Sequence, residues 1–223
     1  VEVRQASFDD TPEAIVAAFQ GAQRMLLIST NAFDMEGTRL RHQVAAVRAA
    51  EKAGIEHLVY TSAPSPEPGT PCFWEADHYA TEQAIKASSM GWTILRNSEY
   101  IEWHMENNWG RALATGQFPF ASGDGRCPYI SRDDCARAAA GALDNAFTRT
   151  RTLDITGAEA LTGEEAMAIL GEVSGKPIVA NLVTGPELRA YLEEVEPNPF
   201  LIPVYVALDQ AIHDGLYGDV TGA

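Results

Sequence analysis

Apolar runs of strand length alternate with runs of helix length along the first half of the chain. Three of the apolar runs, residues 25–31, 57–63 and 92–98, are each followed by a helix-like segment. Alternation at this spacing is typical of βαβ units, whose strands lie parallel in one sheet. The sequence therefore predicts an α/β fold built around a parallel sheet.

Each of these three strands ends in small polar residues. In a parallel sheet the carboxyl ends of the strands open on the same edge, where ligands bind. Thr30, Ser62 and Asn97 are therefore expected to converge on a ligand crevice. The alternative is local, because Ser and Thr often end strands and cap the next helix. No Gly-rich phosphate loop occurs anywhere in the sequence.

The second half of the chain has shorter elements. Helices are expected at 99–114, 133–143 and 199–216, and strands at 118–121, 152–156 and 177–183. Thr162 and Thr184 each precede a Glu by three residues, which predicts two capping boxes that open further helices. Residues 1–6 resemble a short strand. We expect a core at 1–96 and a second lobe at 97–223 that is interleaved with it as one structural domain.

Composition narrows the class of partner. The chain has 223 residues and a formal net charge of −15, which disfavours nucleic acid and an anionic membrane surface. Its three cysteines form no CxxC pair, so we expect neither a disulfide framework nor a metal site. The same cysteine content predicts a cytoplasmic location. No signal peptide is visible. Both ends look cut, so the chain is expected to be part of a longer protein.

One predicted helix carries candidate chemical groups in two registers. Trp74, His78 and Glu82 fall at i, i+4 and i+8, so they share a helical face. His78 at this place is a candidate to donate to a ribose or to transfer a proton; the alternative is a half-solvated His that pairs with Glu82 across one turn. Tyr79 precedes Gln83 by four residues, but Gln carries no charge to activate a tyrosine, so a packing role is favoured for Tyr79.

Several motifs in order resemble one family. They are QASFDD, LLISTN, RHQVAAVRAAEKAGIEHLVYTSA, DHYATEQAI, TILRNSEYIE, ISRDDCARAAA and LTGEEAMAIL. This series is similar to the NmrA-like atypical short-chain dehydrogenase/reductases, and within them to the type-2 NAD(P)H:quinone oxidoreductases. The resemblance implies a Rossmann-like parallel sheet that lacks its N-terminal Gly-rich βαβ unit, followed by a small C-terminal α/β lobe.

The resemblance also implies NADP or NAD as cofactor and a set of cofactor-binding residues. They are Phe8 and Asp9 beside the adenine, Ser29, Thr30 and Asn31 along the ribose and phosphates, Thr61 and Ser62 beside the nicotinamide ribose, and His78 and Asn97 nearby. His78, Asn97 and Tyr100 are the implied catalytic residues. Without the Gly-rich loop, the chain as given is expected to bind the dinucleotide weakly.

Two functions follow from the resemblance, and a third reading stays open beside them. The first is an NAD(P)H-dependent oxidoreductase of quinone-like or small carbonyl compounds, with a small-molecule substrate, no metal, and a homodimer allowed. The second is a non-catalytic NAD(P)-binding redox sensor of the NmrA type that signals to a protein partner. The third is an inert product of truncation. Hydride transfer to any acceptor distinguishes the first from the second.

Overall fold

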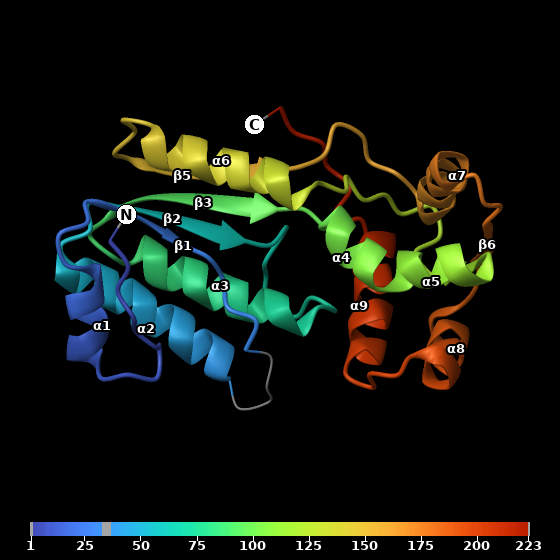
Figure 1. The fold of residues 1–223 in the computed structure, drawn as a ribbon, viewed down its shortest axis with the longest axis horizontal. Helices are drawn as coiled ribbons and strands as arrows, with labels where there is room; N and C mark the ends of the chain where they lie inside the picture. The colour runs from blue at the N-terminus through green and yellow to red at the C-terminus, as the bar shows by residue number, and fades with distance from the viewer. Residues whose placement is uncertain (1, 33–36, 223) are drawn as a thin grey trace. The chain divides into compact units, whose positions relative to one another are not determined.

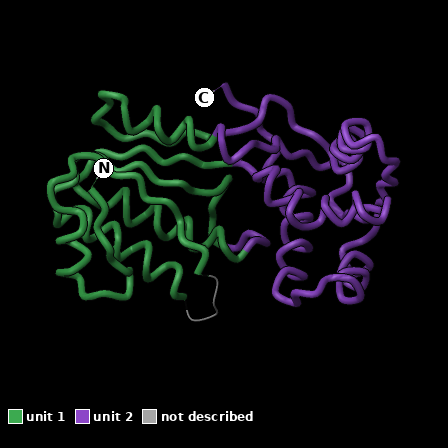
Figure 2. Tube along the Cα trace, in the orientation of Figure 1, with its two compact units in different colours: residues 1–68, 73–97, 135–154 green, residues 69–72, 98–134, 155–223 purple. Residues whose placement is uncertain are grey.

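The computed structural model describes residues 2–32 and 37–222, and its chain forms two compact units (Figure 2). Unit 1 comprises residues 1–68, 73–97 and 135–154; unit 2 comprises 69–72, 98–134 and 155–223. The sequence places the boundary at the end of the strand near residue 96. The structure adds residues 135–154 to unit 1, because they supply a further strand and helix to its sheet.

Unit 1 is built from alternating strands and helices. Its elements are α1 (Pro12–Phe19), β1 (Arg24–Leu27), α2 (Thr38–Ala53), β2 (His57–Ser62), α3 (Phe73–Lys86), β3 (Gly91–Asn97), α6 (Arg132–Asp144) and β5 (Thr150–Ile155). Thr11 caps α1 by accepting from the N–H of Ala14, and Gly54 ends α2 with a left-handed φ of 84°. A residue with a side chain adopts that φ only with strain, so the glycine fixes this helix end.

The four strands form one sheet in the order β1-β2-β3-β5. β1 lies parallel to β2, and β2 lies parallel to β3, with Ser62 opposite Arg96 near their carboxyl ends. Helices α1, α2 and α3 cover one face of this sheet, and α6 covers the other (Figure 1). The predicted parallel α/β arrangement is confirmed, and the polar ends of β1, β2 and β3 open on the same edge.

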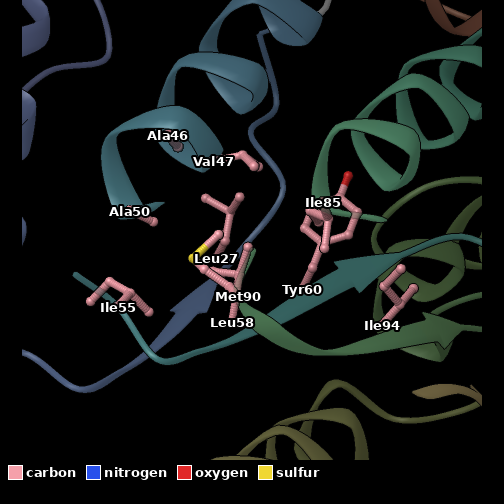
Figure 3. Close-up of a cluster of buried hydrophobic side chains, with 10 residues drawn as sticks. All are labelled: Leu27, Ala46, Val47, Ala50, Ile55, Leu58, Tyr60, Ile85, Met90 and Ile94. Carbon is pink, nitrogen blue, oxygen red and sulfur yellow. The ribbon is translucent and has the colours of Figure 1, made fainter. Parts of the chain in front are cut away.

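Apolar side chains from the sheet and from α2 and α3 form the core of unit 1 (Figure 3). Leu58, Tyr60 and Ile94 are fully buried on the strands, and Ala46 and Ile85 pack on them from the helices. Tyr60 is the polar member of this cluster, and its hydroxyl oxygen points away from its strand in Figure 3. A core strand buried on both faces is the reason why its sequence is apolar without alternation.

The expected strand at residues 1–6 is wrong for the described part of the chain. Residues 2–7 form no strand, and residues 2–6 are exposed. No strand in residues 2–32 and 37–222 pairs with them. The Arg4 guanidinium instead donates to carbonyl oxygens at the end of α1, with 2.6 Å to Gln20 and 3.2 Å to Ala18.

Unit 2 consists of short helices around a two-stranded parallel sheet of β4 and β6. Its elements are α4 (Ile101–Glu106), α5 (Asn108–Thr115), β4 (Gln117–Phe120), α7 (Gly163–Ser174), β6 (Val179–Leu182), α8 (Gly185–Val195) and α9 (Leu201–His213). Both predicted capping boxes are present, at Thr162 and at Thr184.

The single helix expected at 99–114 is in fact two. Asn107 leaves the helical region at φ −123° and ψ −110°, and its side-chain amide donates to the Trp103 carbonyl oxygen at 2.6 Å. The Asn108 side chain accepts from the N–H of Trp109. Asparagine side chains compete in this way with the backbone hydrogen bonds of a helix, and two in succession end it.

No helix in the described parts of the chain is both long and apolar enough to span a bilayer.

Candidate functional site

The polar residues at the carboxyl edge of the unit 1 sheet form the candidate site. Ser29 and Thr30 follow β1, Thr61 and Ser62 end β2, and Asn97 ends β3. The N–H of Ser29 donates to Thr61 Oγ1 at 3.0 Å, so the segment after β1 is joined to the end of β2. Thr30, Ser62 and Asn97 therefore lie at one edge, as predicted.

Thr30 has an unusual hydroxyl. Thr30 Oγ1 is buried and has no hydrogen-bond partner among residues 2–32 and 37–222. A buried hydroxyl without a partner costs free energy, about 1–3 kcal/mol in proteins. A group of this kind at the ligand-binding edge of a parallel sheet fits a polar ligand atom.

Ser62 is committed to a buried carboxylate. Its hydroxyl donates to Glu82 Oε1 at 2.8 Å, and Glu82 also accepts from Arg96 at 2.9 and 3.0 Å and from Lys86 at 2.8 Å. The Glu82 side chain is fully buried. Burial acts to raise the pKa of Glu82, but the hydrogen bonds from Arg96, Lys86 and Ser62 outweigh it and hold that pKa below its ordinary value.

His78 lies in the interior of unit 1, where it is 5% exposed. Its Nε2 lies 2.9 Å from Arg39 Nη2, and its Nδ1 lies 2.8 Å from the Tyr60 hydroxyl. A guanidinium only donates, so Nε2 is the acceptor and the ring is neutral with its proton on Nδ1. Burial, together with the Arg39 charge, puts the pKa of His78 well below 6.5.

Neither expectation for His78 matches these contacts well. The hydrogen-bond partners of the ring are Arg39 and Tyr60, so the pairing with Glu82 across one helical turn is wrong. A buried neutral imidazole with both nitrogens engaged is a poor proton donor, so its placement favours a positioning role. The sequence pattern did not show this, because Arg39 and Tyr60 come from α2 and β2 rather than from the helix of His78.

Phe8 and Asp9 form a second group with α2. The Asp9 carboxylate lies 2.8 Å from His42 Nε2 and 3.6 Å from the Arg41 guanidinium, and the Phe8 ring lies 5.8 Å from the His42 ring. The hydrogen bond with His42 lowers the pKa of Asp9, whose carboxylate stays exposed. His42 thus holds Asp9 in one orientation, which sequence reasoning missed because 33 residues separate the two.

The remaining predicted residues have different surroundings. Asn31 is exposed after β1, and Asn97 is buried at the end of β3. Tyr100 belongs to unit 2, where it precedes α4 and lies under the Arg132 guanidinium at 5.8 Å. Trp109, in α5, is a core residue of unit 2.

Among residues 2–32 and 37–222, the side chains that could bind a metal do not gather. No group of three or more His, Cys, Asp or Glu side chains suited to a metal is present among the described residues. Cys72, Cys127 and Cys135 are buried free thiols. For Cys127, burial and the nearby Glu99 raise the thiol pKa well above its ordinary value, which disfavours the nucleophilic thiolate form.

The chain is similar to a group of nucleotide-dependent reductases. The NmrA-like family model matches residues 1–221. Quinone oxidoreductase 2 of Escherichia coli strain K12 is 30% identical over 195 residues, which are 87% of this chain and 66% of that protein. The chain thus spans about two thirds or less of the length of the first curated relatives that it matches.

Solved structures show the same likeness. The Citrobacter sp. triphenylmethane reductase complexed with NADP(H) has a TM-score of 0.88 at 28% identity, over 99% of this chain and 77% of that one. The E. coli NADPH-dependent quinone oxidoreductase complexed with NADPH has a TM-score of 0.87 at 29% identity, over 98% and 75%. The transcriptional regulator NmrA, at a TM-score of 0.70 and 15% identity over 95% and 67%, shows the fold alone.

Proposed function

The chain belongs to the NmrA-like family, and from this premise we propose that it forms part of an NAD(P)H-dependent oxidoreductase of small quinone-like or carbonyl compounds. The observation that carries the proposal is the carboxyl edge of the unit 1 sheet. The buried Thr30 hydroxyl, the Ser29–Thr61 hydrogen bond and Asn97 meet there. Relatives with the same fold are complexed with NADP(H) and with NADPH.

The residues of unit 1 fit a dinucleotide laid along this edge. Phe8 offers an aromatic face beside the oriented Asp9 carboxylate, which suits the flat adenine and its amino group. The hydroxyls of Ser29 and Thr30 and the side-chain amide of Asn31 suit ribose and phosphate oxygens, whereas the N–H of Ser29 is already bonded to Thr61.

Thr61, Ser62 and Asn97 suit the nicotinamide end of the same dinucleotide. The Ser62 hydroxyl already donates to Glu82, so Ser62 contributes its backbone and a fixed strand end rather than a free donor. When bound, NADH or NADPH supplies a hydride. The chain's own part is then to orient the ring and to keep water away from it. Asn97 remains the proposed residue of unit 1 beside the substrate, and Tyr100 remains a candidate from the family resemblance.

An electron-poor substrate fits this set of residues. Because His78 is neutral and buried, no acid of ordinary histidine pKa is present at its position. A quinone accepts hydride without an obligatory protein acid, since solvent protonates the product. We therefore propose quinone-like compounds ahead of unactivated ketones, whose reduction needs a positioned proton donor.

The test combines binding and turnover. Calorimetry with NADPH and with NADH is carried out on this chain and on a form that carries a Gly-rich βαβ unit before Val1. We expect weak or undetectable binding by residues 1–223 alone and micromolar binding by the longer form, because a helix N-terminus then meets the pyrophosphate. Micromolar binding by the 1–223 chain alone would show that the Gly-rich loop is less important than proposed.

Turnover is measured on the form that binds, with a benzoquinone and with a simple ketone, across pH 5 to 9. We expect the quinone to be reduced faster, with no inflection of the rate near pH 6.5. An inflection there that His78→Asn abolishes would restore His78 as a proton donor and contradict the assignment made above.

A redox sensor of the NmrA type is the alternative. It is distinguished in the same experiment, because binding of both oxidised and reduced dinucleotide without hydride transfer to any acceptor favours the sensor. The likeness to the NmrA regulator concerns the fold, so the reductase is the better supported proposal.

A further inference from the structure

A buried arginine joins the candidate site to the helices behind it. Arg39 lies in the first turn of α2 and is 4% exposed. Its Nε donates to the Thr30 carbonyl oxygen at 2.7 Å, and its Nη1 donates to the Trp74 carbonyl oxygen at 3.1 Å. Its Nη2 donates to His78 Nε2 at 2.9 Å. One guanidinium thus ties the segment after β1 to the first two turns of α3.

The hydrogen bonds beyond Arg39 run in one direction. Since His78 accepts at Nε2, its Nδ1–H donates to the Tyr60 hydroxyl, which in turn donates to Gln43 Oε1 at 2.9 Å. Gln43 lies one turn after Arg39 on α2. The series therefore starts and ends on the same helix, and every group in it has a single fixed role as donor or acceptor.

A purely structural tie does not need a buried charge. Burying a guanidinium costs several kcal/mol unless it is paired and hydrogen-bonded, and Arg39 has an ion pair with Asp77, with Nη1 and Oδ2 3.7 Å apart, beside the hydrogen bonds described above. The planar guanidinium has five N–H donors in a fixed arrangement, so it can bond several carbonyl oxygens at defined angles. The group that it holds nearest, at 2.7 Å, is the backbone of Thr30, which carries the buried hydroxyl without a partner.

We propose that Arg39 is a positioning residue for the dinucleotide, which it serves by fixing the backbone of residues 29–31 at the carboxyl edge of the sheet. The inference rests on the proposed function, because it assigns the purpose of this fixation to ribose and phosphate oxygens of the bound dinucleotide. Arg39 itself acts through Thr30. On the opposite side the guanidinium bonds His78, and Tyr60 and Gln43 are connected to it through His78.

Two substitutions separate positioning from stability. Arg39→Lys keeps the charge but offers one compact ammonium, which cannot bond three acceptors of different direction. Tyr60→Phe breaks the same buried series at its far end and leaves the bond from Arg39 to Thr30 intact. Arg48→Lys, on the exposed side of α2, is the matched conservative control. We expect both buried variants to lower Tm, and Arg48→Lys to leave it unchanged.

The first readout needs no cofactor. Hydrogen exchange of a peptide covering residues 26–32 is measured well below the Tm of every variant. Arg39→Lys is expected to raise its exchange rate about 10-fold, while Tyr60→Phe and Arg48→Lys leave it within about 2-fold of the parent chain. Unchanged exchange in Arg39→Lys would overturn the inference.

The second readout is the Kd for NADPH in the form that binds it. Arg39→Lys is expected to raise Kd about 10-fold, which corresponds to about 1.4 kcal/mol, and Tyr60→Phe less than 2-fold. Faster exchange with an unchanged Kd would overturn the inference, as would an equal rise of Kd in Tyr60→Phe. If the parent protein binds no dinucleotide in either form, the proposed function and this inference are both wrong. If the parent and Arg39→Lys bind the dinucleotide equally well, only the inference is wrong.

Discussion

The two units bury their polar groups in different ways. In unit 1 the buried Glu82 carboxylate accepts from Ser62, Lys86 and Arg96, which keeps its pKa low. In unit 2 the Asp209 carboxylate accepts from the N–H of Ala121, and burial raises its pKa to about 6. The same kind of group is thus held charged in one unit and driven toward its neutral form in the other.

The buried tyrosines repeat this difference. The Tyr60 hydroxyl of unit 1 bonds both His78 and Gln43. The Tyr205 hydroxyl of unit 2 has no hydrogen-bond partner in the part of the chain that the structure describes. Tyr205 and Asp209 line a cavity of about 20 Å³, together with Arg111. Glu82 and the Tyr60 hydroxyl of unit 1 are thus bonded on several sides, although Thr30 Oγ1 at the sheet edge has no partner among the described residues. A network that fixes geometry is what a binding edge needs.

We expect the largest loss of unfolding free energy from a substitution of Glu82, the buried carboxylate of unit 1. Glu82→Gln removes the charge that faces Arg96 and Lys86, and loss of one partner of a buried ion pair typically costs about 3–5 kcal/mol of unfolding free energy. Glu165 of unit 2 is the matched control, because it also pairs with an arginine, Arg126, at 2.8 Å but is exposed. Glu165→Gln keeps the capping box and is expected to cost less than about 1 kcal/mol.

Urea unfolding followed by circular dichroism measures both variants. Equal losses for Glu82→Gln and Glu165→Gln would break the comparison, since burial would then have no bearing on the contribution of the carboxylate.

Much of unit 1 follows from local sequence rules, and its networks do not. The alternation of apolar runs with helix-forming runs, Gly54 after α2 and the polar strand ends all act within a few residues, so the parallel sheet and its ligand edge were predictable. Arg39 looks like any surface arginine of an amphipathic helix. Its burial depends on hydrogen-bond partners on α3 and after β1. Contacts between residues far apart in the sequence do not appear in the hydrophobic periodicity of one helix.

Two errors have the same cause at a smaller scale. The strand expected at residues 1–6 has a strand-like composition, but a strand exists only through a neighbour that pairs with it. The helix expected at 99–114 has a helical pattern, but two consecutive asparagines bond the nearby backbone and divide it. In both segments the available hydrogen-bond partners decide the secondary structure. The hydrophobic pattern of a sequence does not show which partners are available.

The dependence of stability on pH is expected to have opposite signs in the two units. Burial, with the nearby charges of Arg24 and Arg151, lowers the pKa of His57 in unit 1 from 6.5 to about 4. Its neutral form favours folding above pH 6.5, and this stability is lost as pH falls toward 4. The raised pKa of Asp209 has the reverse effect. The folding free energy that neutral Asp209 contributes is complete below pH 3.8 and is lost as pH rises to about 6.

Asp209→Asn isolates the contribution of unit 1. The amide oxygen still accepts from the N–H of Ala121, but the group no longer titrates. We expect the unfolding free energy of this variant to fall more steeply than that of the parent chain as pH drops from 6.5 to 4, by up to about 1.4 kcal/mol per pH unit. Urea unfolding at half-unit steps of pH measures the slope, and identical slopes in the two chains would show that Asp209 does not titrate in this window.

We expect the smallest changes of unfolding free energy from substitutions of the two buried tyrosines, Tyr60 and Tyr205. Tyr60→Phe leaves the Nδ1–H of His78 and the Oε1 of Gln43 without their partner, and an unsatisfied buried group costs about 1–3 kcal/mol. Tyr205→Phe removes a hydroxyl that has no partner among the described residues, so it is expected to change the unfolding free energy by less than about 0.5 kcal/mol, or to raise it. Because both changes delete one oxygen from a buried ring, the volume removed is equal, and the difference between them reports hydrogen bonding alone. Thermal unfolding of the two variants beside the parent chain measures it. A Tyr205→Phe variant that loses as much stability as Tyr60→Phe would mean that the Tyr205 hydroxyl is satisfied in solution, and that unit 2 holds its polar groups as firmly as unit 1 does.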